Sequence, residues 1–169
     1  TADVQFAHGH PPFGMHLRAS MYDTVSWPRV LREQEYVYHV AALRMVTQHV
    51  VLRGEPCRVL DVGCNAGYVS LVAASLGCTV DAFEANPKTA RVARRSFDAN
   101  AFGSQIALHN VGISRVEASL PFLTRGSGPT IYDHMIDEIE AKMRAFDPKS
   151  RVIRVPTRHV SAMISNMPS

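Results

Sequence analysis

The middle of the chain alternates between short apolar runs and longer stretches with helical periodicity. Three short runs rich in β-branched and other apolar residues predict strands: Arg58 to Val62, Thr79 to Phe83 and Ile106 to Ile113. Apolar residues at three-, four- and seven-residue intervals predict helices over 30–51, 68–76 and 87–100. The order β-α-β-α-β with short links is typical of a parallel sheet wound with helices. Right-handed crossovers would place its three strands side by side.

Both flanks of this region give weaker patterns. Residues 1–29 contain the breakers HGHPPFG and SWP and predict an irregular arm. Further elements are predicted downstream: strands over 118–123 and 152–155, a helix carrying Ile136, Ile139 and Met143, and a short helix over 160–164. We therefore expect an arm at 1–29 and one α/β domain over 30–169, since a chain of 169 residues suits a single domain.

Composition and charge exclude few classes of protein. The net charge of +3 is mild and its basic residues are scattered, so a nucleic-acid partner is not indicated. The one dense group, Arg91, Arg94 and Arg95, is predicted to be the solvated face of a helix. No apolar run is long enough to predict a membrane span.

The cysteines bear on the compartment of the protein. Cys57, Cys64 and Cys78 are odd in number and lack zinc-ligand or CxxC spacing, so no metal site is expected. They predict a reduced, intracellular protein, with the cytoplasm favoured over an organelle.

The segment Val59 to Ser70, VLDVGCNAGYVS, joins the first predicted strand to the following helix. Its glycines, Gly63 and Gly67, have G-x-x-x-G spacing, which differs from the G-x-G-x-x-G of dinucleotide binders. The absence of a GK[ST] ending excludes a P-loop. A helix start after such a loop attracts polar or anionic groups, so we predict a ligand tail with a carboxylate and an amine. Asp61 would hold the ammonium; its alternative role is to cap the turn.

An acidic residue ends the second predicted strand. Glu84 lies 21 residues beyond Gly63, where a carboxylate accepts hydrogen bonds from ribose hydroxyls and repels a phosphorylated ribose. The alternative for Glu84 is a solvated strand end. Together with the loop, Glu84 favours a nucleoside cofactor site over a bare turn.

The segment VLDVGCNAGYVSLVAASLG-CTVDAFEANP resembles the S-adenosylmethionine-binding segment of class I methyltransferases, and most closely the FkbM-type family. That family shows D-V-G-A-N-x-G and A-F-E-P-N-P; Cys64 and Ala85 replace an alanine and a proline here. The resemblance implies a Rossmann-like parallel sheet with helices on both faces, its second half incomplete in this chain. It implies S-adenosyl-L-methionine as the cofactor and a cofactor-binding core over 58–114. The implied binding residues are Asp61, Gly63, Cys64, Asn65, Gly67, Tyr68, Phe83, Glu84, Ala85, Asn110 and Val111.

The part that would hold a methyl acceptor is not recognisable. The family's K-I-D-V-E-G-type strand has no counterpart in this sequence, and the sequence does not identify which residue would act as a catalytic base. His109 is predicted to be a packed or surface histidine, and Asp133 and His134 a solvated helix start rather than part of a lid. Tyr68 could touch a ligand or pack in the core. Cys64 is not predicted to be a nucleophile, because any small side chain suffices there.

These observations leave three readings. The first is an S-adenosylmethionine-dependent methyltransferase, an O-methyltransferase by resemblance, with an unidentified acceptor. The second is an inactive methyltransferase-like binding or assembly subunit, in which a protein partner covers the open sheet edge. The third is a fragment of a longer active enzyme. The loop spacing opposes a nucleotide-dependent oxidoreductase.

Overall fold

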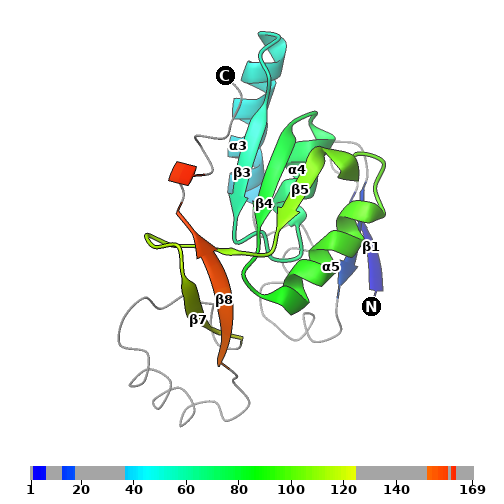
Figure 1. Ribbon diagram of the computed structural model, residues 1–169. Coiled ribbons are helices and arrows are strands. Elements are labelled where there is room, and N and C mark those ends of the chain that lie inside the picture. Colours follow the sequence, from blue (N-terminus) through cyan, green and yellow to red (C-terminus); the bar gives the residue numbers. More distant parts are fainter. Residues whose placement is uncertain (1, 7–12, 18–36, 125–151, 160, 163–169) are drawn as a thin grey trace.

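A computed structural model describes residues 2–6, 13–17, 37–124, 152–159 and 161–162 of the chain (Figure 1). Its elements, in chain order, are β1 (Ala2–Phe6), β2 (Phe13–Leu17), α3 (Val37–Leu52), β3 (Arg58–Val62), α4 (Tyr68–Ser75), β4 (Thr79–Phe83), α5 (Pro87–Asp98), the 3₁₀ turn η1 (Gly103–Gln105), β5 (Ile106–His109), β6 (Gly112–Ile113), β7 (Ser119–Leu123) and β8 (Val152–Arg158). The helix predicted around Ile136, and with it Asp133 and His134, lies outside the described residues, as does most of the one predicted over 160–164.

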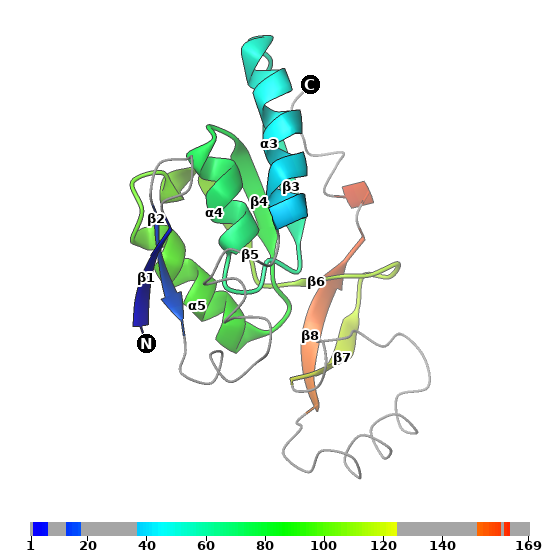
Figure 2. The same ribbon diagram turned by 180° about the vertical axis from the view of Figure 1, so that it is seen from behind.

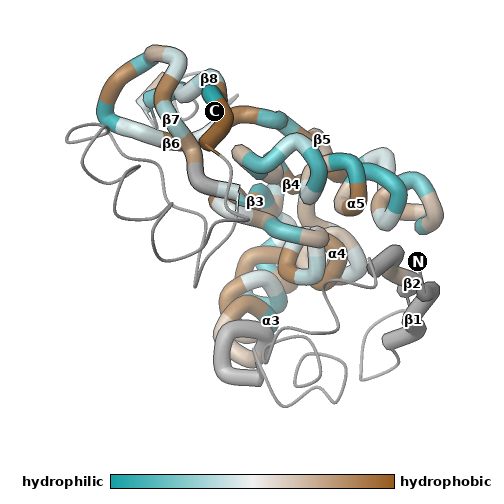
Figure 3. Tube along the Cα trace, turned by 90° about the horizontal axis from the view of Figure 1, so that it is seen from below, coloured by the Kyte–Doolittle hydropathy of each residue, from teal (hydrophilic) through white to brown (hydrophobic). Residues whose placement is uncertain are grey.

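The central sheet is parallel, in the order β3-β4-β5, and confirms the predicted α/β fold and strand order. Helices α3, α4 and α5 lie on one side of this sheet (Figure 3). The prediction was helices on both faces, and within the described residues they cover one face. Local signals set the helix ends: the Asn86 side chain caps α5 ahead of Pro87, and Gly77 adopts a positive φ of 92° after α4.

The hydrophobic core lies between the sheet and these helices. Alternate residues of the strands, such as Val80 and Ala82, point toward α4 and α5 and are buried. The α4 sequence YVSLVAAS is apolar almost all round, which matches its burial within this layer. Phe97 of α5 is fully buried in the same cluster, where it reaches the loop before α4.

The amino-terminal region differs from the predicted irregular arm. β1 and β2 form an antiparallel hairpin, and β2 packs against α5 and α4 (Figure 2). Met15 of β2 is 1% exposed and belongs to the main core. The sequence did not predict this hairpin, because the prolines and glycines of HGHPPFG are typical of irregular structure. They fall between the two strands and at the start of the second one.

The third predicted strand, Ile106 to Ile113, is in fact two strands in different sheets. β5 ends at His109, whose carbonyl accepts the Glu84 N–H at 3.1 Å. β6 then pairs with β8 in parallel, and β8 pairs with β7 in antiparallel fashion. The buried Thr157 hydroxyl donates to the Val116 carbonyl at 2.7 Å and so holds the turn between β6 and β7.

Two of the three cysteines form a disulfide, so the prediction of reduced thiols is wrong for Cys57 and Cys78 in this structure. Each precedes a strand, and the register pairs Arg58 with Thr79, so the two cysteines come to face each other. Their Cα atoms are 4.7 Å apart, and the Thr79 N–H donates to the Cys57 carbonyl at 2.9 Å. The intracellular location, which rested on reduced thiols, stays a prediction.

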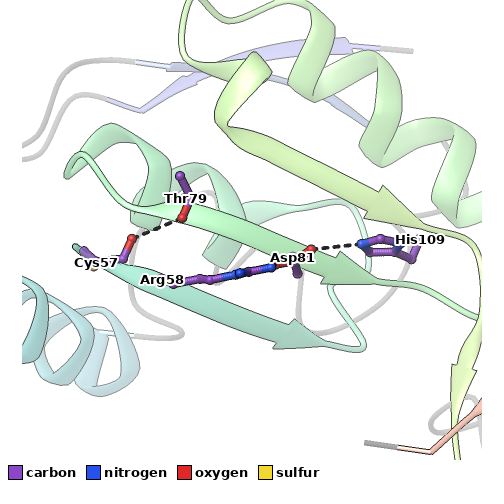
Figure 4. A network of polar contacts seen from close by, with 5 residues as sticks. All are labelled: Cys57, Arg58, Thr79, Asp81 and His109. Carbon is purple, nitrogen blue, oxygen red and sulfur yellow. Dashed lines mark hydrogen bonds and ion pairs between the residues drawn. The ribbon is translucent and has the colours of Figure 1, made fainter. Parts of the chain in front are cut away.

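A polar row crosses the face of the sheet opposite α4. The Asp81 carboxylate accepts two bonds from the Arg58 guanidinium, at 2.9 and 2.7 Å, and pairs with His109 Nε2 at 3.0 Å (Figure 4). The His109 ring also stacks on Phe83, with centroids 4.7 Å apart. Each of the three strands contributes one member, so the row ties the strands together on this side. His109 therefore has the structural role that was predicted for it.

Replacing Asp81 with asparagine is expected to lower the free energy of unfolding by about 1 kcal/mol at neutral pH. Burial opposes ionisation of Asp81, but the hydrogen bonds from His109 and Arg58 and the charge of Arg58 outweigh it and lower the pKa of Asp81 below 3.8. The ionised carboxylate is therefore stabilising above pH 3.8, and this contribution is lost as the pH falls through the lowered pKa.

Urea unfolding at several pH values tests this expectation. The difference in the free energy of unfolding between the native chain and Asp81→Asn should shrink as the pH falls through the lowered pKa of Asp81. Asp98→Asn, an exposed position on α5, is the control and should change nothing. A difference independent of pH would contradict the ionic role of Asp81.

Candidate functional site

The carboxyl ends of β3, β4 and β5 meet at one edge of the parallel sheet, and the predicted site residues gather there. Asp61 lies near the end of β3 and the loop 63–67 follows this strand. Glu84 and Ala85 follow β4, and Asn110 follows β5. Such an edge is where ligands bind in open α/β sheets. The structure thus brings together residues that are almost 50 positions apart in the sequence, as Asp61 and Asn110 are.

The glycine loop is a tight turn held by the neighbouring strand. The Gly63 and Cys64 N–H groups both donate to the Phe83 carbonyl, at 2.8 and 3.0 Å. Asn65 has a φ of 53°, in the left-handed region that asparagine tolerates better than most residues. The Gly67 N–H closes the turn onto the Cys64 carbonyl at 2.8 Å. The backbone of β4 therefore fixes the loop before any ligand is bound.

The two glycines have different roles. Both have positive φ values, 79° at Gly63 and 93° at Gly67. A Cβ on Gly63 would meet no atom within 4 Å, which leaves room beside the loop for a ligand. A Cβ on Gly67 would lie 2.3 Å from Cε1 of Phe97. The space at Gly67 is thus taken by α5, and its small size serves packing within the fold.

Glu84 is 4% exposed, which excludes the alternative of a solvated strand end. Its Oε2 accepts the Asn65 N–H at 3.0 Å, and its Oε1 accepts the Asn86 N–H at 2.7 Å. Burial raises the pKa of Glu84, the two backbone bonds oppose this rise, and the charge of Asp61 adds to it. A carboxylate offers about four lone-pair positions, so both oxygens keep capacity for further donors. Glu84 links the loop to the start of α5.

The residues after β5 and β4 are joined by a side-chain amide. Asn110 Nδ2 donates to the Glu84 carbonyl at 2.6 Å and to the Ala85 carbonyl at 3.3 Å. Ala85 and Val111 are half-buried, whereas Phe83 is covered and stacks on His109. Asn110 therefore holds the segment after β4 in place at the rim of the candidate site.

Asp61 is bound to a residue that the sequence analysis did not single out. The Ser70 hydroxyl donates to Asp61 Oδ2 at 2.5 Å. Because Gly67 has no side chain to cap α4, Asp61 acts as a cap from the preceding strand. Burial raises the pKa of Asp61, and the hydroxyl and backbone of Ser70 oppose the rise. A serine in the first turn of a helix after an acidic strand end was the signal that could have revealed this pair.

No catalytic base or nucleophile stands out in the described residues. Burial, reinforced by the charges of Asp61 and Glu84, raises the pKa of the Cys64 thiol far above its usual range, so a thiolate is not available there. Tyr68 is buried at the start of α4 and belongs to the core cluster. Within the described part of the chain, no group of three or more His, Cys, Asp or Glu side chains could hold a metal ion.

The parallel sheet, with α4 connecting its first two strands and a glycine turn at its carboxyl edge, is a Rossmann-like arrangement of the kind found in class I methyltransferases. The crystal structure of the SAM-dependent methyltransferase from Agrobacterium tumefaciens is similar to this chain, with a TM-score of 0.50 and 18% sequence identity. The likeness covers 66% of this chain and 33% of that chain, and at this identity it concerns the fold alone. The chain thus spans about a third of the length of that methyltransferase.

The chain belongs to the TehB family. The family model described as tellurite resistance protein TehB matches residues 31–126, more than half of the 169 residues. A Staphylococcus aureus structure named as a caffeoyl-CoA O-methyltransferase matches with a TM-score of 0.37 and 23% identity, over 53% of this chain and 45% of that chain. Among curated proteins the chain has no significant match. Every helix in the described part is too short or too polar to cross a lipid bilayer.

Proposed function

We propose that this chain binds S-adenosyl-L-methionine and belongs to an S-adenosylmethionine-dependent methyltransferase. The observation that carries the proposal is the joined arrangement of Asp61, the glycine loop and Glu84 at the carboxyl edge of the sheet. The TehB family match and the SAM-dependent methyltransferase with the same fold support it. The cofactor-binding core would be residues 58–114 within a domain of residues 30–169.

The geometry suits the parts of this ligand. The open space beside Gly63 would admit the methionine part, whose ammonium would meet the Asp61 carboxylate. The remaining lone pairs of Glu84 would accept the ribose hydroxyls, and Ala85, Asn110 and Val111 would flank the nucleoside. The turn around the bound ligand would be formed by Cys64, Asn65, Gly67 and Tyr68. Phe83 would flank the nucleoside together with Ala85. When bound, the sulfonium supplies an electrophilic methyl group, and this chain contributes binding and orientation.

Calorimetric titration of the full chain with S-adenosylmethionine and S-adenosylhomocysteine tests the proposal. We expect binding of both ligands with one site per chain. A folded chain that binds neither would overturn it. Assaying methyl release in the presence of candidate acceptors then separates binding from turnover.

Replacing Glu84 with alanine is expected to weaken S-adenosylhomocysteine binding at least about tenfold. Hydrogen bonds to a charged group contribute roughly 1.5–3 kcal/mol, and each 1.4 kcal/mol is tenfold in the dissociation constant. The variant loses the ribose acceptor and also the bond to the Asn65 N–H. Glu55→Ala is the matched control, because Glu55 is exposed and pairs only with Arg53 among the described contacts. Equal affinities of the two variants would remove Glu84 from the proposed site.

The finer assignment is to O-methyl transfer within the FkbM-type family. It rests on the segments DVGCNAG and AFEANP rather than on an acceptor site. Comparing an alcohol, an amine and a thiol series as acceptors would test it, with methyl transfer to oxygen as the expected result. Transfer to nitrogen or sulfur alone would replace this assignment.

A second candidate function, as a methyltransferase-like assembly subunit, has its own support. Within the described residues, the outer edge of β3 has no neighbouring strand. On the nearby helix α3, Met45, Val46 and Leu52 are exposed, with Leu52 at 86%. Open strand edges and apolar patches favour association with another chain. Ligand binding without turnover on any acceptor, together with a stable complex covering this edge, would favour this candidate.

A further inference from the structure

The serine in the first turn of α4 is more than a packing residue. Ser70 is completely buried, and its hydroxyl donates to Asp61 Oδ2 at 2.5 Å. This bond joins the first turn of α4 to the end of β3, across the glycine turn, and so fixes one oxygen of the Asp61 carboxylate.

We propose that Ser70 is a positioning residue for the methyl donor, because its hydroxyl holds the Asp61 carboxylate in the orientation that receives the donor's ammonium group. This inference rests on the proposed function, and it adds a residue that contacts Asp61 and not the ligand. A carboxylate that accepts the hydroxyl of Ser70 still has lone pairs for a cation. In the absence of Ser70's hydroxyl, the same buried carboxylate would lack its strongest partner.

The electrostatics of the site make this hydroxyl important. Burial raises the pKa of Asp61, and the hydroxyl and backbone of Ser70 work against that rise. The titratable groups coupled to Asp61 are Glu84 at the end of β4, which repels it, and the Cys64 thiol, which stays neutral. No described basic side chain forms an ion pair with Asp61, so Ser70 is its principal stabilising partner.

Loss of the hydroxyl is therefore expected to raise the pKa of Asp61. The donor's ammonium requires the ionised carboxylate, so affinity should fall off at a higher pH in Ser70→Ala than in the native chain. Near neutral pH we expect donor binding about tenfold weaker, the usual effect of losing a hydrogen bond to a charged group. Ser70→Thr, which keeps the donor hydroxyl, should restore the native pH dependence.

The experiment combines two measurements on the full chain. Calorimetric titration with S-adenosylmethionine at a series of pH values gives the affinity profile, and carbon-detected NMR of the Asp61 carboxyl gives its pKa without ligand. Ser75→Ala is the matched control, because Ser75 lies on the same helix and its hydroxyl donates to the Val72 carbonyl at 2.8 Å. Thermal unfolding of each variant verifies that it is folded.

The possible outcomes separate the two proposals. Binding by Ser70→Ala with native affinity and native pH profile would overturn the role of Ser70 and leave the proposed function intact. A folded native chain that binds no donor would overturn the proposed function, and the role of Ser70 with it, even if the Asp61 pKa still shifts. A raised Asp61 pKa together with a displaced affinity profile supports both.

Discussion

Reducing the disulfide between Cys57 and Cys78 is expected to lower the free energy of unfolding by about 3 kcal/mol. The bond joins residues 21 positions apart, and a cross-link closing a loop of this length removes that much chain entropy from the unfolded state. For a chain of this size the midpoint of thermal unfolding should fall by about 6–12 °C. The loop contains β3, the glycine turn and α4, so the bond stabilises the unit that carries the candidate site.

Thiol titration and thermal unfolding with and without dithiothreitol measure this effect. Without reductant, the denatured chain should show one free thiol, that of Cys64, and the reduced chain three. The double variant Cys57→Ala with Cys78→Ala should unfold at the same temperature as the reduced chain, and dithiothreitol should not change this temperature. Cys64→Ala is the control, in which sensitivity to reductant must persist. Three titrating thiols in the untreated protein would rule out the disulfide.

The strands and helices that the sequence predicted well are those whose signals are local. β3 and β4 have the predicted boundaries because an apolar run and its bounding turn residues lie next to each other in the chain. The same holds for the start of α5 at Pro87. The parallel strand order followed from these elements and the right-handed crossover rule alone.

The features that the sequence analysis missed depend on which segments lie side by side. β5 ends at His109 because the Asn110 side chain bonds to the segment after β4, which the apolar run IALHNVGI does not reveal. The disulfide follows from the register of β3 with β4, although both strands were predicted. The hairpin of β1 and β2 is stabilised by packing against helices far along the chain.

The candidate site shows the same division. The loop, Asp61 and Glu84 could be found from spacing, because each lies at the end of a recognisable strand. The backbone bonds of Glu84 could not, because they depend on how the turn folds back. Ser70 was missed, although its place in the first turn of the predicted helix was a signal for its bond to Asp61. The packing role of Gly67 could not be predicted from the sequence either. The side chain that leaves no room for a Cβ at Gly67 belongs to Phe97, which lies on the next helix.

Replacing Gly67 with alanine is expected to lower the free energy of unfolding by about 2–5 kcal/mol. The positive φ of 93° is unfavourable for alanine by roughly 1–2 kcal/mol. The new methyl group would also lie 2.3 Å from the buried Phe97 ring, and overpacking of this kind costs roughly 1–3 kcal/mol. Gly63→Ala is the matched control, because its φ of 79° is similar and its surroundings are open. It should show only the backbone effect, measured by urea unfolding.

A double-mutant cycle with Phe97→Leu isolates the contact. Leucine lacks the Cε1 and Cζ atoms that the alanine methyl would strike, so in this background Gly67→Ala should cost only the roughly 1–2 kcal/mol of backbone strain. The coupling between the two positions should therefore be favourable and at least about 1 kcal/mol. If Gly67→Ala and Gly63→Ala were equally destabilising and no coupling appeared, the glycine at 67 would be required by its dihedral angle alone. A favourable coupling would mean that the second glycine of the loop sets the distance between the turn and α5, while the first leaves space for the ligand.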